Sequence, residues 1–271
     1  MRLKNRAVRL LLVIGLGYLA LCALVFFVQD LLLFPARGVG KSAALPDVPG
    51  VQVEWIVRAD GGRSRAAVTQ AAAPTAVMVW FCGNGEDLRS GVMWARVWRE
   101  YGLSAVVAEY PGYGDSEGEP SEASVRATAD AAVARATAMA TTAGVPLIAG
   151  GASLGSFGAV HVAASGRAAR LLLLAPFTSV RDVAAARFWF LPVGLLLRHP
   201  FDNLARAGEV TVPTLVLHGD RDAVIAAGFG ERLATALRAR YVAATGCGHN
   251  DLPVGRSGRF GDLLHGFFAG R

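Results

Sequence analysis

The chain has 271 residues, 53% of them hydrophobic and 18% charged, so it is long and apolar enough for one α/β domain with a large core. Its net charge is +6, but four of the 27 basic residues lie in the first nine positions, and the other 23 nearly balance the 21 acidic residues. No basic stripe indicates nucleic-acid binding, no cysteine and histidine spacing indicates a metal site, and no glycine-rich phosphate motif indicates a dinucleotide, so we expect no cofactor.

The first predicted element is an N-terminal apolar helix. Four basic residues precede residues 10–28, a stretch of 19 residues without a charge. As a helix this stretch spans about 28 Å, close to the hydrocarbon thickness of a bilayer. A cleavable signal peptide is the alternative, but its apolar region would be shorter and end in small residues, whereas this one ends in bulky residues. We predict a single-pass membrane anchor over residues 1–33, with its basic flank cytoplasmic and the rest of the chain extracytoplasmic, or periplasmic in a bacterium.

Beyond the anchor, residues 34–50 are rich in Gly and Pro and are interpreted as a linker. Residues 51–57 alternate like an early antiparallel strand, and residues 65–70 are a candidate partner for it. Strand and helix patterns then alternate along the chain, which is typical of a mostly parallel sheet covered by helices on both faces. We therefore predict one α/β domain over residues 51–271.

The most informative motif is the run Gly151-Ala152-Ser153-Leu154-Gly155, directly after the apolar residues 145–150. A strand that ends in Gly-x-Ser-x-Gly and turns at once into a helix is typical of the nucleophile elbow of serine hydrolases. In so tight a turn a Cβ at either flanking position would collide with the neighbouring strand or helix, and glycine avoids both collisions. A Gly- and Ser-rich turn without chemistry has the same pattern, so the interpretation requires partner residues.

A serine nucleophile requires a base, and the base requires an acid that orients it. In hydrolases with an elbow the chain order is serine, acid, histidine, and His249 and His265 lie far enough downstream. His249 lies in a flexible-looking loop after a strand-like segment, from which it can reach across the top of the sheet. His265 lies in an amphipathic terminal helix, and His161 lies about two turns beyond Ser153 and points away from it. We predict His249 as the base.

The predicted acid follows the buried strand pattern of residues 212–219. Asp220 and Asp222 both follow this strand, and Asp222 lies far enough beyond the strand end to face the histidine loop. We predict Asp222 as the acid, with Asp220 in reserve. His218, inside the strand end, is interpreted as structural.

An acyl-transfer site also requires two backbone N–H donors for the oxyanion. Leu154, the residue after the nucleophile, supplies one of them. The other is expected from the loop 82–87, which follows the strand pattern of residues 76–81, and we assign it to the amide of Asn84. A tight turn without a chemical role is the alternative for this loop.

These four signals occur in the required order, and each lies at a strand end. The chain resembles the α/β-hydrolases, and among them the membrane-anchored, short-capped members, which include bacterial serine-aminopeptidase-like hydrolases and eukaryotic lipid or protein-acyl hydrolases. The resemblance lies in residues 31–35, 83–87, 110–118, 120–122, 151–155, 175–179, 218–222 and 248–251. It spans about residues 30–270 and implies the fold and the triad, not a substrate.

The chain departs from these proteins at Cys82, where they usually carry histidine before the glycine. Because the oxyanion donor is a backbone amide, we expect the change to affect the pocket wall more than the mechanism. Cys82 and Cys247 both border the predicted site. A disulfide between them is conceivable outside the cytoplasm, but two free, buried thiols are favoured.

Residues 177–209 interrupt the strand–helix alternation and are predicted to form a small cap. Within them, residues 188–197 are intensely apolar. A helix packed on the sheet edge would explain this run, and so would a cap that shapes an acyl pocket or touches the bilayer.

The sequence therefore predicts a membrane-anchored serine hydrolase that cleaves a carboxylic ester or acyl thioester of a small molecule or acyl lipid. Ser153 attacks the carbonyl, His249 transfers the proton, and Asp222 orients the imidazole. An aminopeptidase-like amide hydrolase would use the same triad, although no acidic pair identifies a site for a substrate terminus. A non-catalytic, membrane-anchored binding protein of the same fold is the third hypothesis.

Overall fold

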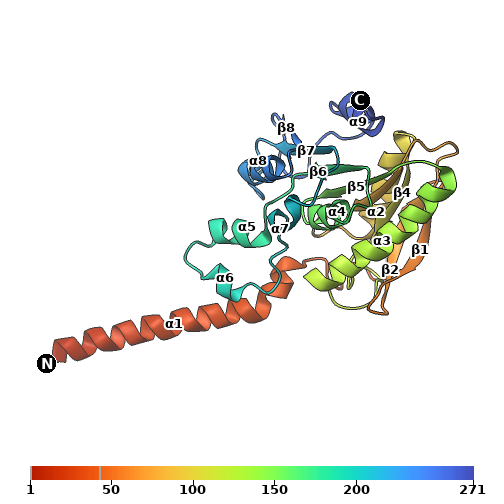
Figure 1. The fold of residues 1–271 in the computed structure, drawn as a ribbon. Coiled ribbons are helices and arrows are strands. Elements are labelled where there is room, and N and C mark those ends of the chain that lie inside the picture. The colour runs from red at the N-terminus through yellow and green to blue at the C-terminus, as the bar shows by residue number, and fades with distance from the viewer. Residues whose placement is uncertain (1, 43) are drawn as a thin grey trace.

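The computed structural model describes residues 2–42 and 44–271 and shows one long helix projecting from an α/β body (Figure 1). The strands are β1 (Val51–Val57), β2 (Arg63–Thr69), β3 (Val77–Phe81), β4 (Ser104–Ala108), β5 (Leu147–Ala152), β6 (Arg170–Leu174), β7 (Thr214–Gly219) and β8 (Arg240–Ala244). The helices are α1 (Arg2–Leu33), α2 (Leu88–Glu100), α3 (Glu122–Ala143), α4 (Gly155–Ala164), α5 (Val180–Arg187), α6 (Val193–Leu196), α7 (Leu204–Ala207), α8 (Ala227–Ala236) and α9 (Gly261–Phe268).

The strands form one sheet in the order β1-β2-β4-β3-β5-β6-β7-β8. β2 pairs antiparallel with both β1 and β4, and all other neighbours are parallel. Parallel neighbours require crossover connections, which helices such as α2, α3 and α4 provide. The predicted fold class, a mostly parallel sheet with helices on both faces, is confirmed.

Alternation along β3 shows how the sequence builds both faces of the sheet. Val79 and Phe81 point to one face, where they pack with α3, α4 and α8, whereas Met78 and Trp80 point to the other, where they pack with α2 and α9. Successive side chains of a strand point to opposite faces, so a strand buried on both faces is apolar throughout.

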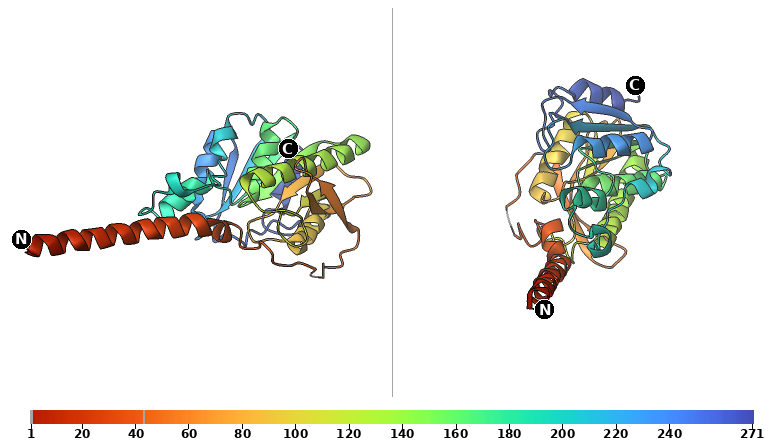
Figure 2. Two further views of the ribbon diagram at one scale, coloured as in Figure 1. Left: turned by 90° about the horizontal axis from the view of Figure 1, so that it is seen from below. Right: turned by 90° about the vertical axis from the view of Figure 1, so that its left-hand side faces the viewer.

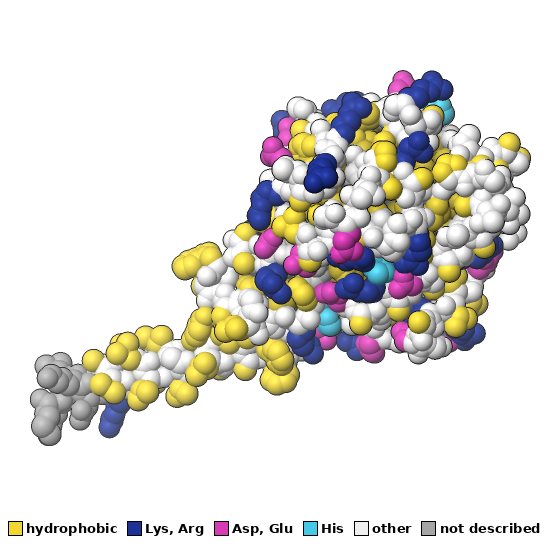
Figure 3. Space-filling view, viewed as in Figure 1, with side chains coloured by type: hydrophobic (Ala, Val, Ile, Leu, Met, Phe, Trp, Pro, Cys, Tyr) yellow, Lys and Arg dark blue, Asp and Glu magenta, His cyan; other side chains and the backbone are white. Residues whose placement is uncertain are grey.

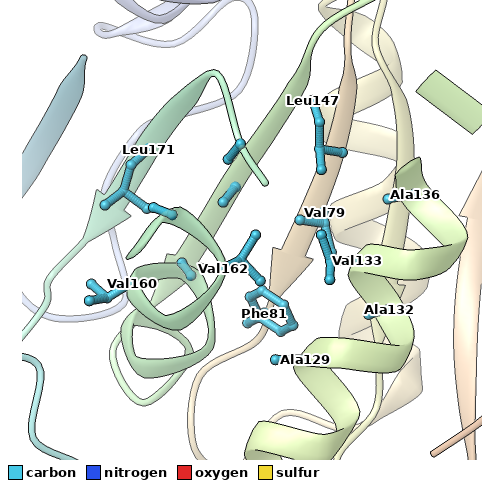
Figure 4. Close-up of a cluster of buried hydrophobic side chains, with 14 of the residues drawn as sticks. Val79, Phe81, Ala129, Ala132, Val133, Ala136, Leu147, Val160, Val162 and Leu171 are labelled. Atoms are coloured by element: carbon cyan, nitrogen blue, oxygen red, sulfur yellow. The ribbon is translucent and has the colours of Figure 1, made fainter. Parts of the chain in front are cut away.

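Small side chains bring α3 and α4 close to the first face (Figure 4). Ala129, Ala132 and Ala136 lie along the inner side of α3 and are fully buried. In α4, a Cβ at Gly158 would lie 2.9 Å from the ring of Phe81. The close approach of α4 fixes the helix whose N-terminus follows Ser153.

The segment after α1 packs against the body in its first residues. Phe34 and Ala36 are buried in a cluster with Tyr110 and Tyr113. The N–H of Gly38 donates to the carbonyl oxygen of Gly112 at 2.8 Å. The beginning of the predicted linker therefore joins α1 firmly to the domain.

The region between β6 and β7 leaves the sheet and carries the short helices α5, α6 and α7 (Figure 2). We call residues 188–197 of this region the cap loop. Trp189 and Leu195 of the cap loop are 83% and 86% exposed. The interpretation as a helix packed on the sheet edge is therefore wrong, because the run lies away from the sheet and beside α1.

Within the described residues, α1 is the one helix long and apolar enough to cross a membrane by length and composition. The segment is Arg6–Leu33, which is strongly apolar and has very little of its surface buried. Hydrophobic side chains cover the part of α1 that projects from the body (Figure 3). This helix is consistent with membrane anchoring.

Candidate active site

The turn between β5 and α4 has the strained geometry expected of an elbow. Ser153 has a φ of 50°, a conformation that is rare for a residue with a side chain, and its N–H donates to the carbonyl oxygen of Leu174 at 2.9 Å. A Cβ at Gly151 would overlap the backbone of Gly155, and a Cβ at Gly155 would overlap the carbonyl of Phe81. The two flanking glycines are therefore sterically required, and the strain falls on Ser153.

Asp222 lies just beyond β7 and is held on both carboxylate oxygens. Oδ1 accepts hydrogen bonds from the N–H groups of Val224 and Ile225, both at 2.8 Å. Oδ2 lies 2.7 Å from Nδ1 of His249 and 3.1 Å from Nε2 of His218. These contacts fix the orientation of the carboxylate and aim one oxygen at His249.

The contacts of Asp222 also determine its charge. Burial by itself raises the pKa of the Asp222 carboxyl, but the hydrogen bonds from His218, His249 and the backbone outweigh it and hold the pKa well below the ordinary value. Asp222 is therefore ionised at neutral pH, as the partner of a histidine base must be.

Ser153, Asp222 and His249 line one cavity of about 1010 Å³, together with Asn84 and Leu154. With Nδ1 of His249 directed at Asp222, its Nε2 lies on the opposite edge of the ring. Within the described residues, neither this Nε2 nor the Ser153 hydroxyl makes a hydrogen bond to a protein group. The fold thus brings all five predicted residues to one cavity, and their catalytic roles remain predictions.

Most of the cavity wall is apolar. It is built from α5, the loop around α8, the elbow and the end of α1. Its large apolar residues are Leu33, Trp94, Leu154, Leu174, Phe177, Val180, Val183, Phe188, Val224, Ile225, Phe229 and Leu252. A wall of this kind suits an acyl chain better than a charged substrate.

The loop after β3 has a defined hydrogen-bond pattern. The N–H of Gly83 donates to the Glu86 carboxylate, whereas within the described residues the N–H of Asn84 donates to no protein acceptor. The Asn84 side chain accepts a hydrogen bond from the hydroxyl of Tyr113 at 2.7 Å and donates one to the carbonyl of Leu33. The Asn84 amide is thus available as an oxyanion donor.

The second predicted oxyanion donor is the main-chain N–H of Leu154. It lies at the N-terminus of α4, where the aligned backbone dipoles favour negative charge. Among the described residues it donates to no protein acceptor either. One amide lies in the loop after β3 and the other directly before α4, and β3 and α4 pack against each other.

The other acid and base candidates are engaged elsewhere. Asp220 accepts a hydrogen bond from the N–H of Gly246 at 2.7 Å, in the loop before His249. His161 contacts Asp130 and Arg206, and burial lowers the pKa of its imidazole. His265 is exposed on α9. None of these three side chains lines the cavity in the described part of the chain.

The cysteines at the site border are free thiols, as favoured above. Cys82 is 3% exposed and packs in the core cluster that contains Trp80. Burial raises the pKa of the Cys82 thiol well above its usual value, so it stays neutral. Our expectation for the departure from histidine is wrong in one respect, because Cys82 faces the core and not the cavity wall.

Two contributions were missed by the sequence interpretation. His218, interpreted as structural, is fully buried and shares its Nε2 between Asp222 and the carbonyl oxygen of Ile225 at 2.9 Å. Leu33, at the end of the predicted anchor, lines the cavity. The motif around residues 218–222 drew attention to His218, but no local sequence pattern indicates that Leu33 lines the cavity.

No protein-family model matches the chain. An uncharacterized protein of Mycobacterium tuberculosis is 35% identical over 171 residues, which cover 62% of this chain and 61% of that protein. The chain thus spans about three fifths of the length of this relative. An uncharacterized membrane protein of Saccharomyces cerevisiae is 26% identical over 213 residues, covering 75% of each chain. The human alpha/beta hydrolase domain-containing protein 17B is 31% identical over 157 residues, covering 54% of this chain and 50% of that protein.

Solved structures resemble the chain over most of its length. An esterase of Pyrococcus furiosus superposes with a TM-score of 0.66 at 14% identity, covering 84% of this chain and 96% of that one. An esterase of Thermogutta terrifontis superposes with a TM-score of 0.61 at 18% identity, covering 83% and 94%. The chain has the α/β-hydrolase fold.

Proposed function

We propose that this chain, with its α/β-hydrolase fold, is a membrane-anchored serine hydrolase that cleaves a carboxylic ester or acyl thioester. The observation that carries the proposal is the meeting of Ser153, Asp222 and His249 in one apolar cavity, with Asp222 bound to His249. The esterase neighbours support the reaction class.

In the proposed mechanism, His249 takes the proton from the Ser153 hydroxyl as that oxygen attacks the substrate carbonyl. Asp222 holds the imidazole in the tautomer whose Nε2 can accept this proton, and its charge stabilises the imidazolium that forms. The amides of Asn84 and Leu154 bind the oxyanion. His249 then protonates the leaving group, and water releases the acyl group by the reverse sequence.

The cavity favours an ester or thioester over a peptide. A peptidase of the aminopeptidase type needs a free carboxylate to bind the substrate's terminal ammonium group. Apart from Asp222, Glu86 is the acidic residue among the described residues of the cavity wall. Its two carboxylate oxygens already accept hydrogen bonds, from the N–H of Gly83 and from the Trp94 indole at 2.9 Å. The apolar wall offers binding energy to an acyl chain instead.

The proposed location follows from α1. A bilayer-spanning α1 keeps its basic N-terminal flank in the cytoplasm and the hydrolase domain on the other side. The relative in yeast is named a membrane protein, which supports the anchor.

The first prediction concerns Ser153. The Ser153→Ala variant should lose activity on a short-chain ester by on the order of 10³-fold or more, because Ser153 is the proposed nucleophile. A fluorophosphonate probe should label the wild-type chain and fail to label this variant.

Ser165→Ala is the matched control, since Ser165 is an exposed serine at the end of α4, the helix that follows Ser153. The probe should label this variant as it labels the wild type. A wild-type chain that the probe does not label would favour the non-catalytic binding protein. Comparing esters of graded acyl length with aminoacyl amides separates the esterase from the peptidase.

A further inference from the structure

The cap loop is a charge-free, exposed apolar segment beside α1. Its ten residues, Phe-Trp-Phe-Leu-Pro-Val-Gly-Leu-Leu-Leu, lie between Arg187 and Arg198. Besides Trp189 and Leu195, its side chains of Phe188 and Phe190 are 45% and 47% exposed. Soluble surfaces rarely leave so large a contiguous apolar patch in water, so the exposure points to an interaction.

Side chains at two positions along α1 form hydrogen bonds with the backbone of the cap loop and of the residue after it. The Tyr18 hydroxyl donates to the carbonyl oxygen of Phe190 at 2.8 Å. Gln29 donates to the carbonyl oxygen of Leu196 at 3.0 Å and accepts from the N–H of Arg198 at 2.8 Å. Tyr18 and Gln29 lie 11 residues apart, so the loop follows α1 for about 16 Å.

The position of Tyr18 sets the depth of the loop if α1 spans a bilayer. The hydrocarbon core takes about 20 helical residues, which fit between Arg9 and Asp30 or, with Arg9 reaching out to the surface, slightly nearer the N-terminus. Every such placement includes Tyr18 and leaves it at least about 10 Å inside the core from the domain side. The carbonyl of Phe190, bonded to Tyr18, lies at the same depth.

Most backbone N–H groups of the cap loop are paired within the protein, although those of Trp189 and Phe190 have no acceptor among the described residues. Hydrocarbon offers no hydrogen-bond partner, so polar backbone groups there must be paired within the protein. The N–H groups of Leu191, Val193, Leu195, Leu196 and Leu197 donate to carbonyls inside the loop. The carbonyls of Phe190 and Leu196 are paired by α1, as described above.

Charged groups gather where the loop and the helix would leave the membrane together. Arg198 forms an ion pair with Asp30 at 2.8 Å, and His199 lies 3.6 Å from the same carboxylate. Figure 3 shows hydrophobic side chains gathered on α1 and on the neighbouring cap. A boundary of this kind is expected at a bilayer surface.

We propose that the cap loop enters the bilayer beside α1, so that the cavity receives its acyl chain directly from the membrane. Phe188 at the base of the loop and Leu33 at the end of α1 both line the cavity. The proposed substrate is therefore an ester of a long acyl chain that resides in the bilayer. This substrate class depends on the proposed hydrolase function, whereas the insertion of the loop does not.

The insertion is tested by fluorescence of the full chain reconstituted in phosphatidylcholine vesicles with brominated acyl chains, which quench tryptophan on contact. Trp189 and Trp55 are the exposed tryptophans among the described residues, and Trp55 lies on β1 at the far edge of the sheet. Trp189→Phe should remove most of the quenching, and the matched variant Trp55→Phe should leave it unchanged.

Two outcomes would overturn the insertion. In one, aqueous iodide quenches Trp189 and the brominated lipid does not, which would place the loop in water. In the other, neither reagent quenches Trp189, which would mean that protein, such as a second copy of the chain, covers the loop.

The delivery of substrate is tested by activity. The double variant Trp189→Ser, Leu195→Ser should lower the turnover of a long-chain ester in phosphatidylcholine vesicles several-fold. Turnover of a short, water-soluble ester should not change, because neither side chain lines the cavity. Equal loss on both substrates, or on neither, would overturn the delivery route. A wild-type chain that cleaves no ester refutes the hydrolase function, while the quenching experiment still decides the insertion.

Discussion

At the scale of single residues, the Asp222 carboxylate binds two imidazoles and two backbone N–H groups. His249 continues into the cavity, whereas His218 ends in the core with its Nδ1 buried and unpaired. The imidazole of His218 therefore leaves Asp222 little freedom to rotate away from His249. The strain of Ser153 is the second feature at this scale, and the neighbouring glycines make room for it.

The depressed pKa of Asp222 predicts a pH dependence of stability. A carboxyl whose pKa is lower in the folded than in the unfolded chain stabilises the fold above the unfolded pKa, about 4 for aspartate. This contribution is lost as the pH falls from about 4 toward the folded pKa. Asp222→Asn should therefore be less stable than the wild type at pH 7, and the difference should shrink in acid.

Urea unfolding at pH 7 and pH 3 measures this difference. Asp220→Asn is the matched control, because Asp220 lies two residues away and contacts neither imidazole. A stability difference between wild type and Asp222→Asn that is the same at both pH values would contradict the prediction.

The meeting of Ser153, Asp222 and His249 at one cavity could be predicted from their residue types, their chain order and their positions at strand ends, and their catalytic roles remain predictions. The contact between His218 and Asp222 could not be predicted in the same way. It depends on the turn that brings the carbonyl of Ile225 to the same imidazole. Such an irregular turn leaves no periodic pattern in the sequence from which its shape could be predicted.

At the scale of elements, the strands and helices of the body follow the apolar periodicity of the sequence. β2 begins at Arg63, two residues earlier than expected, because its pairing with β1 extends to Val57 opposite Arg63. The cap loop could not be placed from its own pattern. Its apolar residues would suit any apolar surroundings, so their pattern alone does not show where the loop lies. Its position depends on α1, more than 150 residues away in sequence.

The elbow is the element whose geometry is most sensitive to one methyl group. Gly155→Ala places a Cβ on the backbone of Phe81, so either α4 or β3 must shift. We expect the free energy of unfolding to fall by about 1–3 kcal/mol, as for other overpacked sites, and ester turnover to fall with it, since Ser153 and Leu154 move.

Gly228→Ala is the control for this substitution. Gly228 also lies in the first turn of a helix, α8, but a Cβ there meets nothing within 4 Å. Denaturant unfolding and ester turnover of both variants test the prediction, and equal behaviour of the two alanine variants would contradict it.

At the scale of the whole molecule, α1 and the cap are one structural unit attached to the sheet. Gln29 is 4% exposed, and two hydrogen bonds of its side chain join α1 to the cap, one at Leu196 and one at Arg198. No sequence pattern predicted this joint, because a glutamine at the end of an apolar run also suits a membrane surface. The joint makes the position of the cap depend on the helix.

Removing the Gln29 side chain should loosen the cap without unfolding the body. Gln29→Ala leaves the carbonyl of Leu196 and the N–H of Arg198 without partners, at a cost of about 1–3 kcal/mol. Hydrogen exchange of the full chain should be faster over residues 195–198 and unchanged in the sheet. Gln52→Ala, on the exposed side of β1, is the control, and equal exchange in both variants would contradict the prediction.

The hydrogen bond from Asn84 to the carbonyl of Leu33 has a mechanical consequence. A domain joined to its anchor by a flexible chain could rotate freely, but here the last residue of α1 is hydrogen-bonded to Asn84, in the loop that carries a proposed oxyanion donor. With α1 spanning a bilayer as proposed, the cavity would keep one orientation relative to the membrane surface. A change in the tilt of α1 in a thicker or thinner membrane would then act directly on the loop that carries Asn84.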